Sequence, residues 1–267
     1  MLRNIFLKTF YEHRRGLLWW AVGLLSYAAL IAGFYPSVRQ MPDINQMIET
    51  APGELMAALV GDLTDLTSPA GYLNSQVFFF LGPLLLIIFA IGKGVAALAG
   101  EEERGTLDLL LANPVSRARV VLEKLAALLV MTIGLAAALW IGLAILSAAI
   151  EMEISATRLA EATLGTMLLA AVFGVLALAL GAASGQSGLS LGVTSAIALI
   201  TYLLNALAAV IGKLEPYRVL SPFYYATTAD PLVNGLHVGH TLVLVAMILV
   251  FSAAAVLLFG RRDLAAG

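Results

Sequence analysis

Few residues in this chain have the types and spacing that chemistry requires. His237 and His240 lie three positions apart beside a long apolar stretch, but no third ligand is near them in the sequence. A zinc site in a protein normally needs three or four protein ligands. We therefore interpret the two histidines as hydrogen-bonding groups at a membrane interface. The chain also lacks a catalytic constellation of paired carboxylates, a Ser/His pair or an H-E-x-x-H sequence, so we expect that it is not an enzyme.

A second short pattern, at residues 92–94, resembles part of a phosphate-binding loop. The P-loop needs a glycine five positions before its second glycine, and a Ser or Thr after its lysine. This chain has Ile87 and Gly94 at those two positions. We therefore expect no cofactor in this chain. If ATP drives its function, a partner must bind the ATP and Mg²⁺.

The composition is that of a membrane protein. Hydrophobic residues make up 61% of the 267 residues and charged residues 12%, against about 25% charged in soluble domains. A membrane-spanning helix needs about 20 apolar residues. Six stretches meet this requirement: residues 17–35, 72–92, 125–150, 162–183, 189–212 and 241–260. The sequence thus predicts an all-α protein with one transmembrane domain over residues 1–267. No cysteine is present, so disulfides and thiolate metal sites are excluded.

The basic residues predict the orientation of these spans. Most of them precede the first span, lie between the second and third, or follow the sixth: Arg3, Lys8, Arg14, Arg15, Lys93, Arg104, Arg117, Arg119, Lys124, Arg261 and Arg262. By the positive-inside rule, both termini and residues 101–124 face the cytoplasm of a multi-pass protein in the cell membrane. A cleaved signal peptide is the alternative for the N-terminus, but the apolar run is too long for one.

The predicted span interiors contain no Asp, Glu, Lys or Arg. Ion-coupled transporters need ionisable groups near the middle of the membrane, so this class is disfavoured. Asn205, one turn after Tyr202, is the most conspicuous polar group in a span. We expect it to form an interhelical hydrogen bond rather than a substrate contact. The recurring glycines of residues 165–192 are interpreted as sites of close helix packing.

Three segments outside the spans have recognisable patterns. In residues 1–15, Leu2, Ile5, Phe6, Thr9 and Phe10 form an apolar stripe, which predicts an interfacial amphipathic helix; the alternative is the cytoplasmic start of the first span. Residues 36–71 contain four prolines and scattered acids, with short helices expected at 44–48 and 55–60. Residues 213–239 are both apolar and broken by prolines, which favours a short re-entrant or interfacial helix pair.

The charged segment between spans two and three carries most of the functional information. Residues 93–104 extend the second span, and Gly105 interrupts the helix. Thr106 is a suitable N-cap for a short helix over residues 107–112, and Pro114 ends that helix. Ser116 is a suitable cap for a following basic helix. Leu107, Leu110 and Leu111 share one face of the short helix, and such an apolar ridge with a charged rim fits a groove in a partner protein.

This segment resembles the motif of the permeases of type-2 ABC transporters. The resemblance rests on the sequence EEERGTLDLLL at residues 101–111, on NPVSR at residues 113–117 and on Lys124. It implies that residues 101–119 form a coupling helix that docks on a separate ATP-binding subunit. The implied docking residues are Glu101, Glu102, Glu103, Arg104, Thr106, Leu107, Leu110, Leu111, Pro114 and Arg117.

The resemblance further implies the membrane subunit of an ATP-driven exporter. Two ATPase subunits and a second permease subunit, identical or not, would complete the complex in the lipid membrane, and no nucleic acid is involved. The apolar spans suit a hydrophobic or amphiphilic substrate. Three alternatives remain: a membrane anchor or signal transmitter that uses an ABC ATPase, an ion-coupled transporter and a membrane-embedded enzyme.

Overall fold

The structure is a bundle of long helices. The computed structural model describes residues 4–40, 67–112, 114–208 and 210–262, and no strand occurs within these ranges. Six helical stretches in them are long and apolar enough to cross a membrane: Ile5–Arg39 (α1), Pro69–Ala97, Arg117–Ala149 (α8), Ala156–Ser184 (α9), Ser187–Ala208 (α10) and Val238–Arg261 (α12). The predicted all-α class and the six spans are confirmed.

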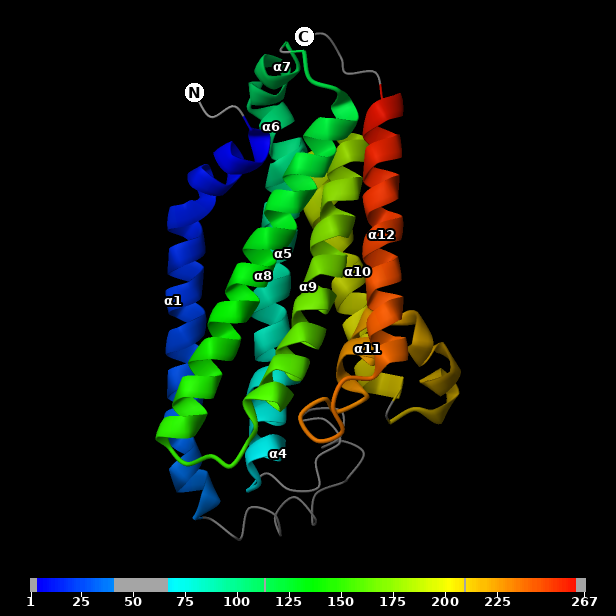
Figure 1. The fold of residues 1–267 in the computed structure, drawn as a ribbon. Helices are drawn as coiled ribbons and strands as arrows, with labels where there is room; N and C mark the ends of the chain where they lie inside the picture. Colours follow the sequence, from blue (N-terminus) through cyan, green and yellow to red (C-terminus); the bar gives the residue numbers. More distant parts are fainter. Residues whose placement is uncertain (1–3, 41–66, 113, 209, 263–267) are drawn as a thin grey trace.

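The second span is built from several helical pieces. It begins with α4 (Pro69–Leu73), continues through a π-helical segment, η1 (Asn74–Phe78), and then forms α5 (Leu81–Ala97). Ser68 caps its start by accepting a hydrogen bond from the amide of Gly71. Such π-helical turns interrupt the regular hydrogen-bond ladder, so this span changes its local geometry near the end that carries α4 in Figure 1.

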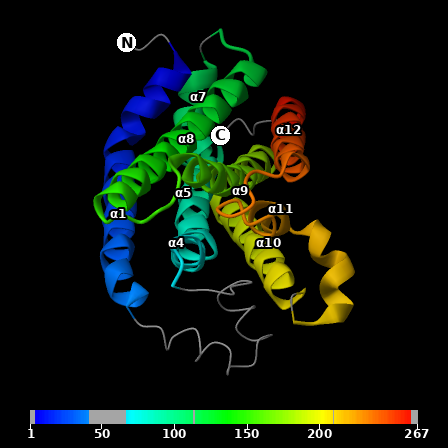
Figure 2. The same cartoon turned by 60° about the horizontal axis from the view of Figure 1, so that its bottom comes forward.

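Helix α9 lies at the centre of the bundle and contacts α5, α8, α10 and α12 (Figures 1 and 2). Glycines allow the close approach of α5 and α9. A β-carbon added at Gly94 would lie 2.1 Å from the carbonyl oxygen of Gly174, and one at Gly174 would lie 3.0 Å from the carbonyl oxygen of Ala90. Gly188 and Gly192 of α10 face open space instead. The prediction of close packing therefore holds for Gly174 of α9 but not for Gly188 and Gly192 of α10.

Helix α1 is longer than its predicted span at both ends. It continues through Pro36 to Arg39, because a proline removes only one helical hydrogen bond when its φ suits the helix. At its start, the residues predicted as an interfacial helix form the first turns of the same helix from Ile5 onward. Ile5, Phe6 and Phe10 pack against the core of the bundle, so this part of the apolar stripe faces the protein.

The two ends of the bundle differ in character. The start of α1, the short helices α6 (Ala99–Glu103) and α7 (Thr106–Leu111), and the end of α12 share one end, which we call the α7 end (Figure 1). The opposite end, here the α11 end, holds the connection between α8 and α9, η2 (Gly212–Leu220) and α11 (Pro222–Thr227). The short helices expected at 44–48 and 55–60 lie outside the described residues.

Short helices occupy residues 212–227, as predicted for this proline-containing segment. The guanidinium of Arg218 in η2 donates to the side-chain oxygen of Asn205 at 2.9 Å, and Ser221 donates to the carbonyl of Thr201 at 2.7 Å. Asn205 is buried, and its hydrogen-bond partner lies in the short helix η2 rather than in another span. These two bonds fix η2 and α11 against the end of α10.

Candidate functional site

The α6–α7 segment is the site that the sequence singled out, and local backbone chemistry explains its shape. The long helix α5 ends at Ala97, and Leu98 leaves the helical geometry with φ −122° and ψ −63°. Gly105 then takes φ +68°, a left-handed conformation that favours glycine. The hydroxyl of Thr106 donates to the carbonyl of Glu101 at 3.0 Å. Helix α7 spans Thr106–Leu111, so Thr106 is its first residue rather than the predicted cap before a helix over residues 107–112. Its side chain ties α7 back to α6.

The next helix begins as predicted. The hydroxyl of Ser116 accepts a hydrogen bond from the amide of Arg119 at 3.3 Å, and Ser116 has extended backbone geometry. Both are properties of an N-cap. Helix α8 starts at Arg117 and runs without a break to Ala149. The α6–α7 segment is therefore joined directly to the third span by the short connection over residues 112–116.

Three consecutive carboxylates of α6 each bind a different helix. Glu101 forms an ion pair with Lys124 of α8. Glu102 accepts two hydrogen bonds from the guanidinium of Arg262, at the end of α12, at 2.5 and 2.9 Å. Glu103 accepts a hydrogen bond from the backbone amide of Ser187, the first residue of α10, at 2.7 Å. Residues of α6 thus contact the ends of three spans.

The three links differ in their exposure to solvent. The side chains of Lys124 and Glu101 are 2% and 10% exposed, and those of Arg262 and Glu102 are 22% and 24% exposed. Glu103 is exposed. The amide of Ser187 stabilises the ionised carboxylate and holds the pKa of Glu103 below its usual range. Charge at this position also suits the positive end of the α10 dipole.

The structure corrects the predicted role of Leu107. Its side chain is fully buried in the core of this chain, so it does not belong to an exposed ridge. Leu110 is half-buried and packs against the same core, and the side chain of Leu111 lies outside the described part. A six-residue helix has little stability of its own, and it therefore needs this burial to form.

The remaining predicted docking residues divide into two groups. Those at the surface lie at the two ends of α7: Glu103, Arg104, Thr106 and Pro114. Arg117 is half-buried, and its guanidinium donates to the carbonyl oxygen of Arg262 at 2.5 Å. Glu101 and Glu102 are engaged in the ion pairs described above. The predicted set is thus contiguous in space, but only part of it is free to meet a partner.

Sequence reasoning missed the contacts that Lys124, Ser187 and Arg262 make with the carboxylates of α6, although the resemblance already rested in part on Lys124. Arg262 was interpreted only as a topology signal, and nothing in its local sequence indicates contact with Glu102. A signal for Lys124 exists, because Val120, Lys124 and Leu128 are spaced four apart and all three are buried. This spacing places the lysine on the buried face of α8.

No cluster of metal ligands occurs among the described residues. Among them, no three His, Asp or Glu side chains lie close enough to hold a metal ion. The ring of His237 caps α12 by accepting a hydrogen bond from the amide of His240 at 3.2 Å. This agrees with the interpretation of His237 as a hydrogen-bonding group, whereas the ring Nδ1 of His240 is buried without a hydrogen-bond partner among the described residues.

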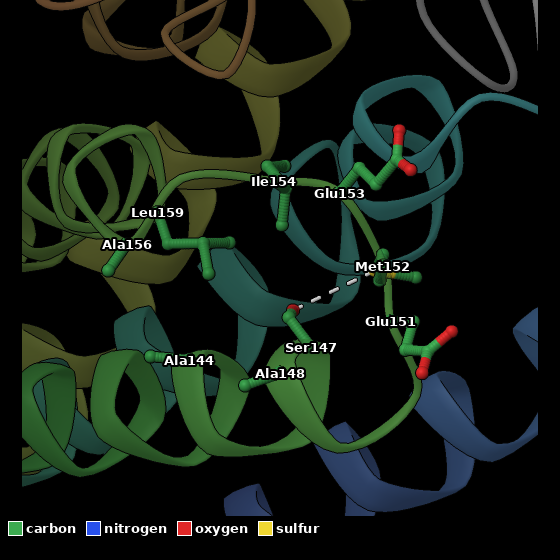
Figure 3. Close-up of a pocket in the computed structure, with 9 residues that line it drawn as sticks. All are labelled: Ala144, Ser147, Ala148, Glu151, Met152, Glu153, Ile154, Ala156 and Leu159. Carbon is green, nitrogen blue, oxygen red and sulfur yellow. Dashed lines mark hydrogen bonds between the residues drawn. The ribbon is translucent and has the colours of Figure 1, made fainter.

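Grooves also follow the seam between α8 and α9. One, of about 290 Å³, opens at the α11 end and is mostly apolar, with the carboxylates of Glu151 and Glu153 turned away from its apolar residues (Figure 3). Ser147 donates to the sulfur of Met152 within it. A second, of about 170 Å³, lies farther along the same helices and is lined by Ile133, Ala136, Ala137, Trp140, Ala160, Thr163, Leu164 and Met167. Both are suited to apolar groups.

Comparison with known proteins places the chain in a family. The family model described as ABC-2 family transporter protein matches residues 3–264. No curated protein matches the chain. The match covers nearly the whole sequence, and this family consists of membrane subunits of ABC transporters, which implies an ATPase partner. With its six membrane-spanning helices and the motif of residues 101–117, the chain belongs to the ABC-2 family of transporter proteins.

Proposed function

We propose that this chain is the permease of an ATP-driven exporter and that the exposed surface of its α6–α7 segment docks on the ATPase. Two ATPase subunits would bind the ATP and Mg²⁺, and a second permease subunit would complete the transport path. The α7 end would face the cytoplasm, so that both termini lie on that side. The concentration of basic residues at this end supports the orientation.

The observation that carries this proposal is the two-sided character of the α6–α7 segment. Its inner side is fixed to the bundle through Leu107 and the three carboxylates. Its outer side presents Arg104, Thr106 and Pro114 at the surface. A partner that moves this outer side would therefore displace the ends of several spans together. Rigid-body movement of spans is a common way to open a path alternately to the two sides of a membrane.

The grooves between α8 and α9 support a hydrophobic or amphiphilic substrate. Their linings are largely aliphatic, and the larger one has two carboxylates near its rim. Apolar pockets with a few polar groups are typical of sites for small molecules. An amphiphile could place its apolar part in such a groove and keep its polar end at the rim.

Purification of the tagged chain from the membranes of its own cells tests the assembly. We expect a protein with a Walker A sequence to co-purify, and the complex to hydrolyse ATP. The substitution Arg104→Glu reverses an exposed charge on the proposed surface and should lower recovery of the ATPase at least about fivefold, since charges at the edge of an interface control association. Recovery equal to that of the native chain would contradict the docking surface.

The control is Arg261→Glu, which makes the same charge change at an exposed residue at the end of α12 and should leave recovery unchanged. Leu107→Asp is not a suitable test, because it places a charge in the core and would unfold the segment. Export is tested in proteoliposomes with a lipophilic cationic dye and a fluorescent phospholipid. ATP hydrolysis without movement of either probe would favour the anchor or signalling role over export.

A further inference from the structure

The acidic run of α6 attaches this helix to three others with unequal strength. Successive residues of a helix point about 100° apart, so Glu101, Glu102 and Glu103 reach in three different directions. Each one meets a separate element: α8, the end of α12 and the start of α10. Three neighbouring residues therefore determine which spans follow α6 when it moves.

The link to α8 is the one that resists separation. Lys124 and Glu101 are almost completely buried, and separating them would leave two charges without partners in a region of low dielectric constant. Leu107, Val120 and Val121 are fully buried in the same core. Helix α7 ends at Leu111 and α8 begins at Arg117, so only a short connection separates them. Helices α6, α7 and α8 are thus held to one another by both charge and packing.

The end of α12 is held in three places. Arg262 donates to both carboxylate oxygens of Glu102, and its own carbonyl accepts a hydrogen bond from Arg117 of α8. Its guanidinium also lies against the turn between α9 and α10, because a β-carbon at Gly185 would be 2.1 Å from one of its nitrogens. We assign the end of α12 to the same unit as α6 and α8.

The link to α10 is the weakest of the three. It is a single hydrogen bond from the amide of Ser187 to an exposed carboxylate, where water competes for both groups. Helix α10 buries few of its residues, chiefly Ser190, Thr194, Ala198, Asn205 and Ala208. It is connected to α9 through Gly185, whose φ of +67° marks a sharp turn. Helix α10 can therefore separate from α6 at low cost.

From this grading we propose that the Glu103–Ser187 hydrogen bond is a releasable tether, and that Glu101–Lys124 is a permanent one. During the transport cycle α6, α7, α8 and the end of α12 move as one unit, pivoting where Leu98 interrupts the helix after α5, and α10 leaves this unit. That an ATPase drives this movement rests on the proposed function. The difference between the two links is a property of this chain alone.

Hydrogen exchange of the purified chain in lipid nanodiscs tests the difference in strength between these two links, and it needs no ATPase. We expect Glu103→Gln to speed amide exchange at the start of α10 at least about threefold and to leave α8 unchanged, since an exposed hydrogen bond affects only its own surroundings. We expect Glu101→Gln to speed exchange at least about tenfold in both α6 and the start of α8. Equal effects of the two variants, or an effect of Glu103→Gln that reaches α8, would overturn the inference.

Cysteine pairs test the release in the assembled complex. The chain has no native cysteine, so introduced thiols can be linked specifically by a short bifunctional reagent. One variant carries Glu103→Cys with Ser187→Cys, and its matched control carries Glu101→Cys with Lys124→Cys. The control removes both charges of the buried pair and so leaves neither unpaired.

We expect linking of the 103–187 pair to fall at least about fivefold when the complex is trapped with ATP and vanadate, and the linked complex to lose ATP-driven transport of the dye. The 101–124 pair should link equally in both states, and its linked complex should keep transport. Equal linking of the 103–187 pair in both states would overturn the proposal, as would separation of the 101–124 pair. Absence of any ATPase from the native complex would instead contradict the proposed function, and the exchange experiment would still decide the grading.

Discussion

The buried ion pair between Glu101 and Lys124 gives the sharpest prediction about stability. The lysine side chain is 2% exposed and the glutamate side chain 10% exposed. Removing one partner from such a pair typically costs about 3–5 kcal/mol, because the other charge remains buried without compensation. We therefore expect Lys124→Met and Glu101→Gln each to lower the free energy of unfolding by about that amount. The double variant should lie within about 1 kcal/mol of the native chain, since no unpaired charge remains.

Thermal unfolding in detergent, followed by the loss of the monodisperse chain, measures this double-mutant cycle. A loss of about 3 kcal/mol corresponds to a fall of roughly 6–12 °C in Tm, at about 2–4 °C per kcal/mol for chains near this size. The control is Arg119→Met, which breaks the more exposed pair with Glu123 on the same helix and should cost no more than about 1 kcal/mol. Additive effects of the two single variants would refute the reasoning.

Three further predictions concern packing and pH. Gly94→Ala should destabilise the chain by at least about 1–3 kcal/mol, because its β-carbon would meet a backbone carbonyl of α9. The control Gly92→Ala has open space around its β-carbon and should be neutral or stabilising by up to about 1 kcal/mol. The Tm values of the two variants measure the difference. Gly185→Ala should cost about 1–2 kcal/mol for its left-handed backbone, and more in the native chain than in the Arg262→Ala background, where the guanidinium it would displace is gone. The lowered pKa of Glu103 means that its tether contributes stability above the ordinary pKa of 4.5 and loses it as the pH falls through the lower folded-state value; unfolding measured against pH should show this loss in the native chain and not in Glu103→Gln.

Local patterns predicted the parts of the fold that depend on local physics. The lengths of the apolar runs predicted six spans, because crossing a bilayer sets a minimum length for any helix. Gly105 and Ser116 predicted the two breaks around α7, because a left-handed residue and an N-cap each act within a few positions of the chain. The end of α1 was misplaced at Pro36, since a proline permits a helix to continue when packing compensates for one lost hydrogen bond.

The contacts between distant segments were not accessible in the same way. Glu102 and Arg262 are 160 positions apart, and Glu103 and Ser187 are 84 apart. In a single sequence a basic residue such as Arg262 indicates only topology, because no local pattern distinguishes a paired basic residue from a solvated one. Only Lys124 carried a local clue, its place on the buried stripe of α8.

The burial of Leu107 changes how a partner would act on this segment. A helix as short as α7 is not stable alone, so the leucine that stabilises it against the bundle cannot also fill a groove in another protein. The surfaces left for a partner are the two ends of α7, where Arg104, Thr106 and Pro114 are exposed. Leu107 would then transmit a push from these ends into the core instead of receiving it. Packed interiors resist compression, so such a push would move α6 and α8 as a body, and the weakest attachment, at α10, would separate first.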